Sequence, residues 1–242
     1  MHSLNMNKTA MKHSLQTVIT QSALPLVHRV RSAHSDSAEN VPCLILLHGV
    51  GANEANLIDF AERQDPRLTV ILVRGPIAFG PHQYGWFNVN FTGSGPVIDA
   101  LQAEQSRQAL IGFIERLPAA YGIDPARIWI AGFSQGGILS ASVGLTRPDK
   151  VSGFGILSGR ILPEIAPLTA NVTDLRNAHA FVSHGIQDAK LSIDLARSAQ
   201  RLLMEKSVQL TYREYDAGHE LNDAMQRDFA QWLTRQIDVA HS

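Results

Sequence analysis

A serine stands between two glycines in the stretch "WIAGFSQGGILSA". The residues before it favour a strand and those after it favour a helix, so the GxSxG spacing predicts a sharp strand-to-helix turn at Ser134. Gly132 and Gly136 remove side chains that would collide in such a turn, and Gly137 lets the new helix lie close to the sheet. The turn places the Ser134 hydroxyl at a helix N-terminus, where it is predicted to be a nucleophile. An ordinary glycine-rich turn is the alternative.

A serine hydroxyl needs a base to take its proton and a carboxylate to orient that base. Of the 10 histidines, His219 in "YDAGHELND" follows the last predicted strand on a glycine-containing loop. Asp188 in "FVSHGIQDAKLS" follows the strand before that one. Asp216 is nearer to His219 in sequence, but it would have to fold back to reach the far ring nitrogen. We therefore expect Asp188 to orient His219 and His219 to act on Ser134.

Strand and helix patterns alternate along the chain, and together they must position these three residues. Short apolar segments typical of buried parallel strands occur at 43–49, 68–75, 127–134, 151–159, 179–185 and 208–215. Helical spacing occurs between them, at 54–64, 97–122, 135–148, 192–207 and 221–237. This alternation predicts an α/β fold with a mostly parallel central sheet and helices on both faces. Residues 15–21 and 24–33 suit antiparallel N-terminal edge strands.

Composition limits the other possibilities. The 21 basic and 22 acidic residues of this 242-residue chain give a formal charge of -1, which makes no electrostatic case for a nucleic-acid partner. No apolar run approaches the length of a membrane span, and the start of the sequence has no secretory signal pattern. The single cysteine, Cys43, sits in an apolar segment. We expect a disordered tail at 1–13, a single domain at 14–242, a cytoplasmic location and no stable membrane association.

Several motifs together resemble the phospholipase/carboxylesterase branch of the α/β hydrolases, which holds small bacterial carboxylesterases, acyl-protein thioesterases and lysophospholipases. They are "LLHGVGANEANL", "RGP" with "YGWF" following, "AGFSQGG", "SHGIQD" and "AGHE". The similarity runs from about residue 41 to about residue 235, and the order Ser134, Asp188, His219 is the α/β-hydrolase order. The resemblance implies hydrolysis of a small-molecule ester or thioester through an acyl-enzyme, with no metal and no organic cofactor.

The same resemblance assigns the groups that would hold the oxyanion. They are the backbone N–H groups of Val50, in the loop after an early strand, and of Gln135, the residue after the nucleophile. Their side chains are expected to matter less than their backbones. A tight turn or a phosphate cradle is the alternative for the loop at 48–51, although no GxxxxGK[ST] motif occurs. His48 and His184 each precede a glycine and are expected to be structural rather than metal ligands.

Substrate contacts are expected from Trp86, Phe87, Leu191 and Leu221, with the segment "YGWF" lying beside the active site by resemblance. The insertion at 77–96 is too short for a large helical lid, which favours short to medium acyl chains. A lysophospholipase or acyl-protein thioesterase stays open, as do, further off, a peptidase, a lactone hydrolase and a non-catalytic binding module. A dienelactone-type enzyme would carry cysteine at position 134. A homodimer is also left open.

Overall fold

The computed structural model describes residues 15, 17–21, 24–34, 40–92 and 95–239. The tail expected at 1–13 lies outside the described residues. Among the described residues, no helix combines the length and the apolar character needed to cross a bilayer.

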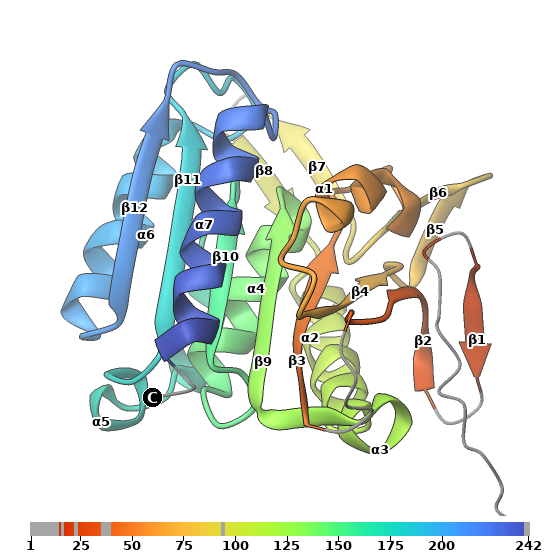
Figure 1. Ribbon diagram of the computed structural model, residues 1–242. Coiled ribbons are helices and arrows are strands. Elements are labelled where there is room, and N and C mark those ends of the chain that lie inside the picture. Colours follow the sequence, from red (N-terminus) through yellow and green to blue (C-terminus); the bar gives the residue numbers. More distant parts are fainter. Residues whose placement is uncertain (1–14, 16, 22–23, 35–39, 93–94, 240–242) are drawn as a thin grey trace, which may run out of the picture.

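Within the described chain, a central sheet of eight strands forms the middle layer, in the order β1-β2-β4-β3-β9-β10-β11-β12 (Figure 1). Neighbouring strands from β4 to β12 in this order are parallel, whereas β1 and β2 are antiparallel, as the sequence predicts. The strands are β1 (Ile19–Gln21), β2 (Leu24–Arg31), β3 (Val41–Leu47), β4 (Thr69–Val73), β9 (Ile123–Phe133), β10 (Gly153–Leu157), β11 (His179–Gly185) and β12 (Gln209–Tyr215). All six predicted parallel strands are therefore present.

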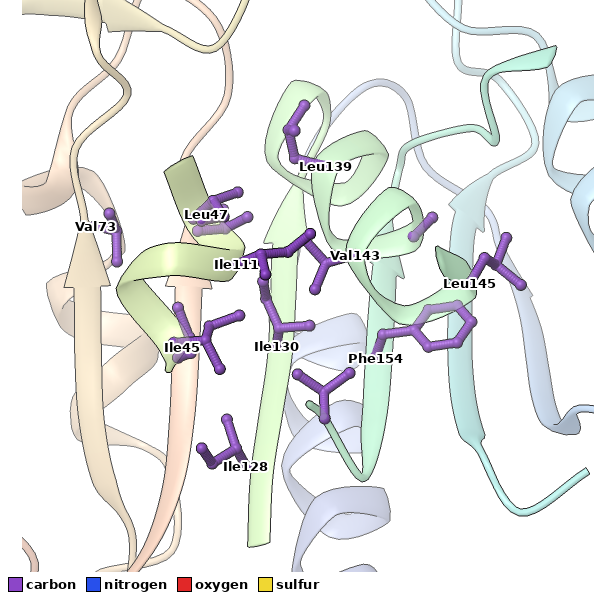
Figure 2. Close-up of a cluster of buried hydrophobic side chains, with 14 of the residues drawn as sticks. Ile45, Leu47, Val73, Ile111, Ile128, Ile130, Leu139, Val143, Leu145 and Phe154 are labelled. Atoms are coloured by element: carbon purple, nitrogen blue, oxygen red, sulfur yellow. The ribbon is translucent and has the colours of Figure 1, made fainter. Parts of the chain in front are cut away.

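Helices cover both faces of this sheet because its strands carry apolar side chains on both sides. One face packs against α2 (Ala100–Ile114), α4 (Gln135–Thr146) and α6 (Ile193–Glu205). Figure 2 shows this cluster, with Ile45, Ile130 and Phe154 of the strands beside Ile111 and Val143 of the helices. The other face packs against η1 (Glu54–Leu57), α1 (Ile58–Glu62) and α7 (Asp223–Val239). Two short elements, η2 (Pro163–Leu168) and α5 (Val172–Leu175), lie between β10 and β11 in the chain.

The helical pattern at 97–122 does not form one helix, which corrects the prediction. Its first two residues end β8 (Gly95–Ile98), and Asp99 then caps α2 by accepting a hydrogen bond from the backbone N–H of Gln102 at 3.0 Å. The rest divides into α2 and α3 (Leu117–Tyr121), with Pro118 in the first turn of α3. Proline lacks an N–H and its ring collides with the preceding turn, so it starts helices far better than it continues them.

The insertion at 77–96 forms two hairpins, which the sequence reading did not foresee. They are β5 (Ile77–Gly80) with β6 (Gln83–Gly85), and β7 (Val89–Thr92) with β8. β6 also pairs with the loop after β3, since the Gly51 N–H donates to the Tyr84 carbonyl and the Tyr84 N–H donates to the Ala52 carbonyl, both at 2.8 Å. The first hairpin therefore holds the glycine loop in place.

Two helical glycines allow a test of how tightly α4 packs on the sheet. A Cβ at Gly144 would collide with the buried Phe154 ring, whereas a Cβ at Gly112 in α2 would meet only the end of the Arg116 side chain, at 3.3 Å. We expect Gly144→Ala to lower the free energy of unfolding by about 1–2 kcal/mol, because overpacking outweighs the gain in helix propensity. Gly112→Ala is expected to raise it by about 0.5–1 kcal/mol. Urea denaturation followed by circular dichroism compares them, and equal stabilisation by both would contradict the packing of α4.

Candidate active site

Ser134 lies between the end of β9 and the start of α4, at the carboxyl edge of the sheet. Its backbone has φ 54° and ψ -115°, and a positive φ is unusual for a residue with a side chain. The Ser134 N–H donates to the carbonyl of Leu157 at 2.8 Å, which ties the turn to the neighbouring strand β10. The surrounding structure thus holds a strained serine in one conformation.

The glycines around Ser134 are required by close backbone contacts. A Cβ at Gly132 would collide with the backbone of Gly136, and a Cβ at Gly136 would lie 2.8 Å from the His48 carbonyl and closer still to that of Leu47. A Cβ at Gly137 would lie 2.7 Å from the Gly132 carbonyl. The prediction that these glycines let the strand, the turn and the helix pack closely is confirmed.

The structure brings Ser134, His219 and Asp188 together. Ser134 Oγ lies 2.9 Å from His219 Nε2, and His219 Nδ1 lies 2.7 Å from Asp188 Oδ2. The other carboxylate oxygen, Asp188 Oδ1, accepts the backbone N–H groups of Lys190 at 2.9 Å and Leu191 at 2.8 Å. Burial raises the pKa of Asp188, but the hydrogen bonds from Leu191, His219 and Lys190 outweigh it and hold this pKa below its ordinary value. The carboxylate is therefore ionised at neutral pH.

Asp216 is placed elsewhere. Its side chain is exposed, and its Oδ1 accepts a hydrogen bond from Gln187 Nε2 at 2.5 Å. The bond links the loop after β11 to the loop after β12. Asp188, and not the aspartate nearest in sequence, contacts the His219 ring.

Further hydrogen bonds position the Asp188 and His219 loops from behind. His184, which is fully buried, donates from Nε2 to the Leu191 carbonyl at 2.7 Å, and the same nitrogen is 3.2 Å from Asp188 Oδ2. Ser158 Oγ donates to the Glu220 carbonyl at 3.1 Å, next to His219. No sequence pattern predicts this role for Ser158, because its partner lies 62 positions away.

The glycine loop after β3 reaches the same site. His48 donates from Nδ1 to the Gly49 carbonyl at 2.7 Å and accepts the Gly75 N–H at Nε2 at 2.9 Å, so both ring nitrogens are occupied. Burial lowers the pKa of His48. Nowhere in the part of the chain that the structure describes do three or more His, Cys, Asp or Glu side chains form a group able to hold a metal ion.

A partly buried ion pair anchors the end of this loop, and the sequence analysis did not predict it. Arg74 donates to both carboxylate oxygens of Glu54, at 2.6 and 2.7 Å, and Arg29 approaches the same carboxylate at 3.3 Å. Burial raises the pKa of Glu54, but the hydrogen bonds and charge of Arg74 hold it below its ordinary value. Paired in this way, a buried carboxylate fixes the start of η1 rather than serving as a free acid.

The Gln135 side chain has a structural role that the sequence analysis did not assign to it. Its Oε1 accepts the Trp86 N–H and its Nε2 donates to the Phe87 carbonyl, both at 2.7 Å. The Trp86 ring is buried and donates from Nε1 to the His48 carbonyl at 2.9 Å. The glutamine of "GFSQGG" therefore clamps the segment before β7 onto the start of α4.

A cavity of about 380 Å³ opens beside Ser134. Most of its wall is apolar, and its lining residues are Gly49, Val50, Phe87, Val89, Pro96, Ile98, Phe133, Ser134, Gln135, Ile138, Arg160, Lys190, Leu191 and His219. Val50 and Gln135 thus lie at the cavity with Ser134, as do Phe87 and Leu191.

Trp86 and Leu221, the two other predicted substrate contacts, are not among the residues that line this cavity. Trp86 lies behind the wall, where Gln135 and His48 hold it. Leu221 packs against the apolar cluster under α7, on the other face of the sheet. Neighbours in sequence can point to opposite sides of a wall, as Trp86 and Phe87 do.

Comparison with known proteins gives one consistent result. Residues 28–237 match the phospholipase/carboxylesterase family. The acyl-protein thioesterase 1 of Eremothecium gossypii is 28% identical over 210 residues, which cover 81% of this chain and 88% of that protein. A probable carboxylesterase of Arabidopsis thaliana, SOBER1-like, is 25% identical over 215 residues, which cover 82% of this chain and 80% of that protein.

Solved structures share the fold. The carboxylesterase from Mesorhizobium loti superposes with a TM-score of 0.75 at 23% identity, over 90% of this chain and 98% of that one. The two proteins therefore share the arrangement of the sheet and the helices. Because the family match spans most of the sequence, this chain belongs to the phospholipase/carboxylesterase family of α/β hydrolases and is an esterase-type hydrolase.

Proposed function

We propose that the protein hydrolyses carboxylic esters or thioesters through an acyl-enzyme formed on Ser134. The observation that carries this proposal is the line of contacts from Ser134 Oγ to His219 Nε2 at 2.9 Å and from His219 Nδ1 to Asp188 Oδ2 at 2.7 Å. A neutral imidazole between a hydroxyl and a carboxylate can take the hydroxyl proton as a bond forms.

In the first half of the reaction, His219 Nε2 accepts the proton of Ser134 as Oγ attacks the carbonyl carbon of the substrate. The oxygen of that carbonyl becomes an oxyanion, which the backbone N–H groups of Val50 and Gln135 stabilise. Both residues line the cavity with Ser134. The protonated His219 then gives its proton to the departing alcohol or thiol, which leaves the acyl group on Ser134.

In the second half, His219 takes a proton from water, and the resulting hydroxide attacks the acyl carbon. The proton returns to Ser134 Oγ as the carboxylic acid leaves. Asp188 accepts a hydrogen bond from the Nδ1–H of His219 throughout the reaction, which keeps Nε2 directed toward Ser134. Its negative charge also stabilises the ring when the ring is protonated.

The cavity supports a preference for short to medium acyl chains. Its volume of about 380 Å³ and its apolar wall, which includes Phe87 and Leu191, suit an alkyl group of modest length. The insertion before α2 forms hairpins rather than a helical lid among the described residues. Thioesters remain within the proposal, because a relative is named as an acyl-protein thioesterase, and lysophospholipids are tested beside them.

Hydrolysis of p-nitrophenyl esters from acetate to palmitate tests the proposal. We expect kcat/KM to be highest for short to medium chains, with no jump in rate above the critical micelle concentration. Ser134→Ala should lower kcat by at least about 10⁴-fold, because nothing replaces the nucleophile. The matched control is Ser142→Ala in α4, whose Oγ donates only to the Ile138 carbonyl. Equal activity of the wild type and Ser134→Ala would disprove the proposal, and acyl-CoA and lysophospholipid extend the series.

A second pair of variants tests which carboxylate orients His219. We expect Asp188→Asn to lower kcat by about 10³- to 10⁴-fold, because the amide can no longer hold the Nδ1 proton and the wrong tautomer forms. Asp216→Asn should have little effect, since Asp216 is exposed and bonded to Gln187. Both are measured with one ester after circular dichroism has shown that each is folded. The assignment is wrong if Asp216→Asn is the impaired variant.

A further inference from the structure

The cavity beside Ser134 carries positive charge that the proposed mechanism does not use. Arg160 and Lys190 are among the described residues that line it, and none of those lining residues is an aspartate or a glutamate. The whole chain has 21 basic and 22 acidic residues, so a cationic cavity does not simply reflect the composition of the protein. The two permanently charged residues that line the cavity are therefore both basic.

The two cations lie on one side of Ser134. Arg160 belongs to the loop after β10, and Lys190 belongs to the loop after β11, the adjacent parallel strand. The loop that carries Val50 follows β3, which pairs with β9 on the other side. Since parallel strands present their carboxyl ends at one edge of the sheet, the oxyanion donor and the two cations flank Ser134 from opposite sides.

Arg160 has an unused donor. Its Nε is buried and has no hydrogen-bond partner in the described part of the chain, which is an unfavourable arrangement for a donor. Burial lowers the pKa of Arg160, and the charge of Glu164 only partly opposes this. Glu164 is itself exposed. An arginine nevertheless stays protonated at neutral pH, so Arg160 places a cation in the cavity wall.

We propose that the preferred substrates are esters or thioesters that also carry an anionic oxygen group, a carboxylate or a phosphate, held by Arg160 with Lys190 as a second contact. The planar guanidinium matches the oxygens of such groups, and the apolar wall with Phe87 and Leu191 holds the alkyl part. This inference rests on the proposed function, because the anion must bind beside Ser134. Arg160 would determine substrate specificity by binding the anionic group and would take no part in breaking the ester bond.

Two matched pairs of substrates test this inference and separate the sources of the anion. The first pair is mono-4-nitrophenyl glutarate and its neutral methyl ester, which differ by a carboxylate on the acyl side. The second pair is 1-hexanoylglycerol-3-phosphate and 1-hexanoylglycerol, which differ by a phosphate on the alcohol side. The enzymes are the wild type, Arg160→Gln, Lys190→Gln and Arg227→Gln. The last variant removes an equal charge from an exposed position in α7 outside the cavity lining.

We expect the wild type to prefer the anionic member of at least one pair, and Arg160→Gln to lower kcat/KM for that member by about 10- to 100-fold, the effect of losing a charge-assisted hydrogen bond. Lys190→Gln should have a smaller effect. Arg160→Gln and Lys190→Gln should impair hydrolysis of the neutral esters much less than hydrolysis of the anionic member, and Arg227→Gln should match the wild type throughout. An unchanged anionic-to-neutral ratio in Arg160→Gln for both pairs would overturn the inference.

A binding measurement keeps this result separate from the proposed function. Glutarate and glycerol 3-phosphate are titrated into Ser134→Ala, and the shift in Tm is compared with that of Ser134→Ala combined with Arg160→Gln. We expect at least one anion to raise the Tm of the first protein and to lose that effect in the second. If the wild type hydrolyses no ester, the proposed function fails, and the Tm measurement alone then decides whether Arg160 binds an anion. Equal Tm shifts in both proteins would refute anion binding by Arg160.

Discussion

The close approach of three backbones at the Ser134 turn is the constraint on which the rest of the site depends. The end of β9, the first turn of α4 and the end of β3 meet at Gly132, Gly136 and Leu47, where no Cβ can be accommodated on either glycine. This contact holds Ser134 at a positive φ and brings the loop after β3 beside it. The apolar clusters on both faces of the sheet hold the strand and the helix in place independently of the turn. Their free energy of packing offsets the strain at Ser134.

Around that turn, hydrogen bonds between loops hold the other site residues in position relative to Ser134. Asp188 is held by two backbone N–H groups, and the His219 loop is tied through Ser158 to the end of β10. On the other side of Ser134, the hairpin of β5 and β6 and the Glu54–Arg74 pair hold the glycine loop. Gln135 links the two sides, since it follows the serine and also clamps the cavity wall. Each chemical group is thus supported from a different strand.

The sequence predicted the parts of this architecture that depend on local pattern. The six parallel strands are apolar runs, and the glycines around Ser134 follow from the geometry of one turn. The long helical pattern at 97–122 was misread because its apolar spacing continues past the end of α2, while Pro118 starts a new helix. The two hairpins at 77–96 lack a strong strand pattern and are short. Sequence order did favour Asp188 over Asp216, because loops after adjacent strands can meet.

Other features became visible only when distant segments were brought together. The Gln135 clamp, the Ser158 bond and the cationic side of the cavity all join residues that lie far apart in the sequence, for which a single sequence has no signal. Trp86 and Leu221 show the converse, since closeness in sequence to Phe87 and His219 did not place them at the cavity.

The line of contacts from Asp188 through His219 to Ser134 should activate the Ser134 hydroxyl above those of the other serines. The most direct measurement is peptide mass spectrometry after reaction with a fluorophosphonate, which forms a stable adduct with an activated serine. We expect one adduct per chain, on the peptide that contains Ser134, and no adduct when the protein is unfolded before the reaction. An adduct on another serine of the folded protein, or no adduct at all, would contradict it.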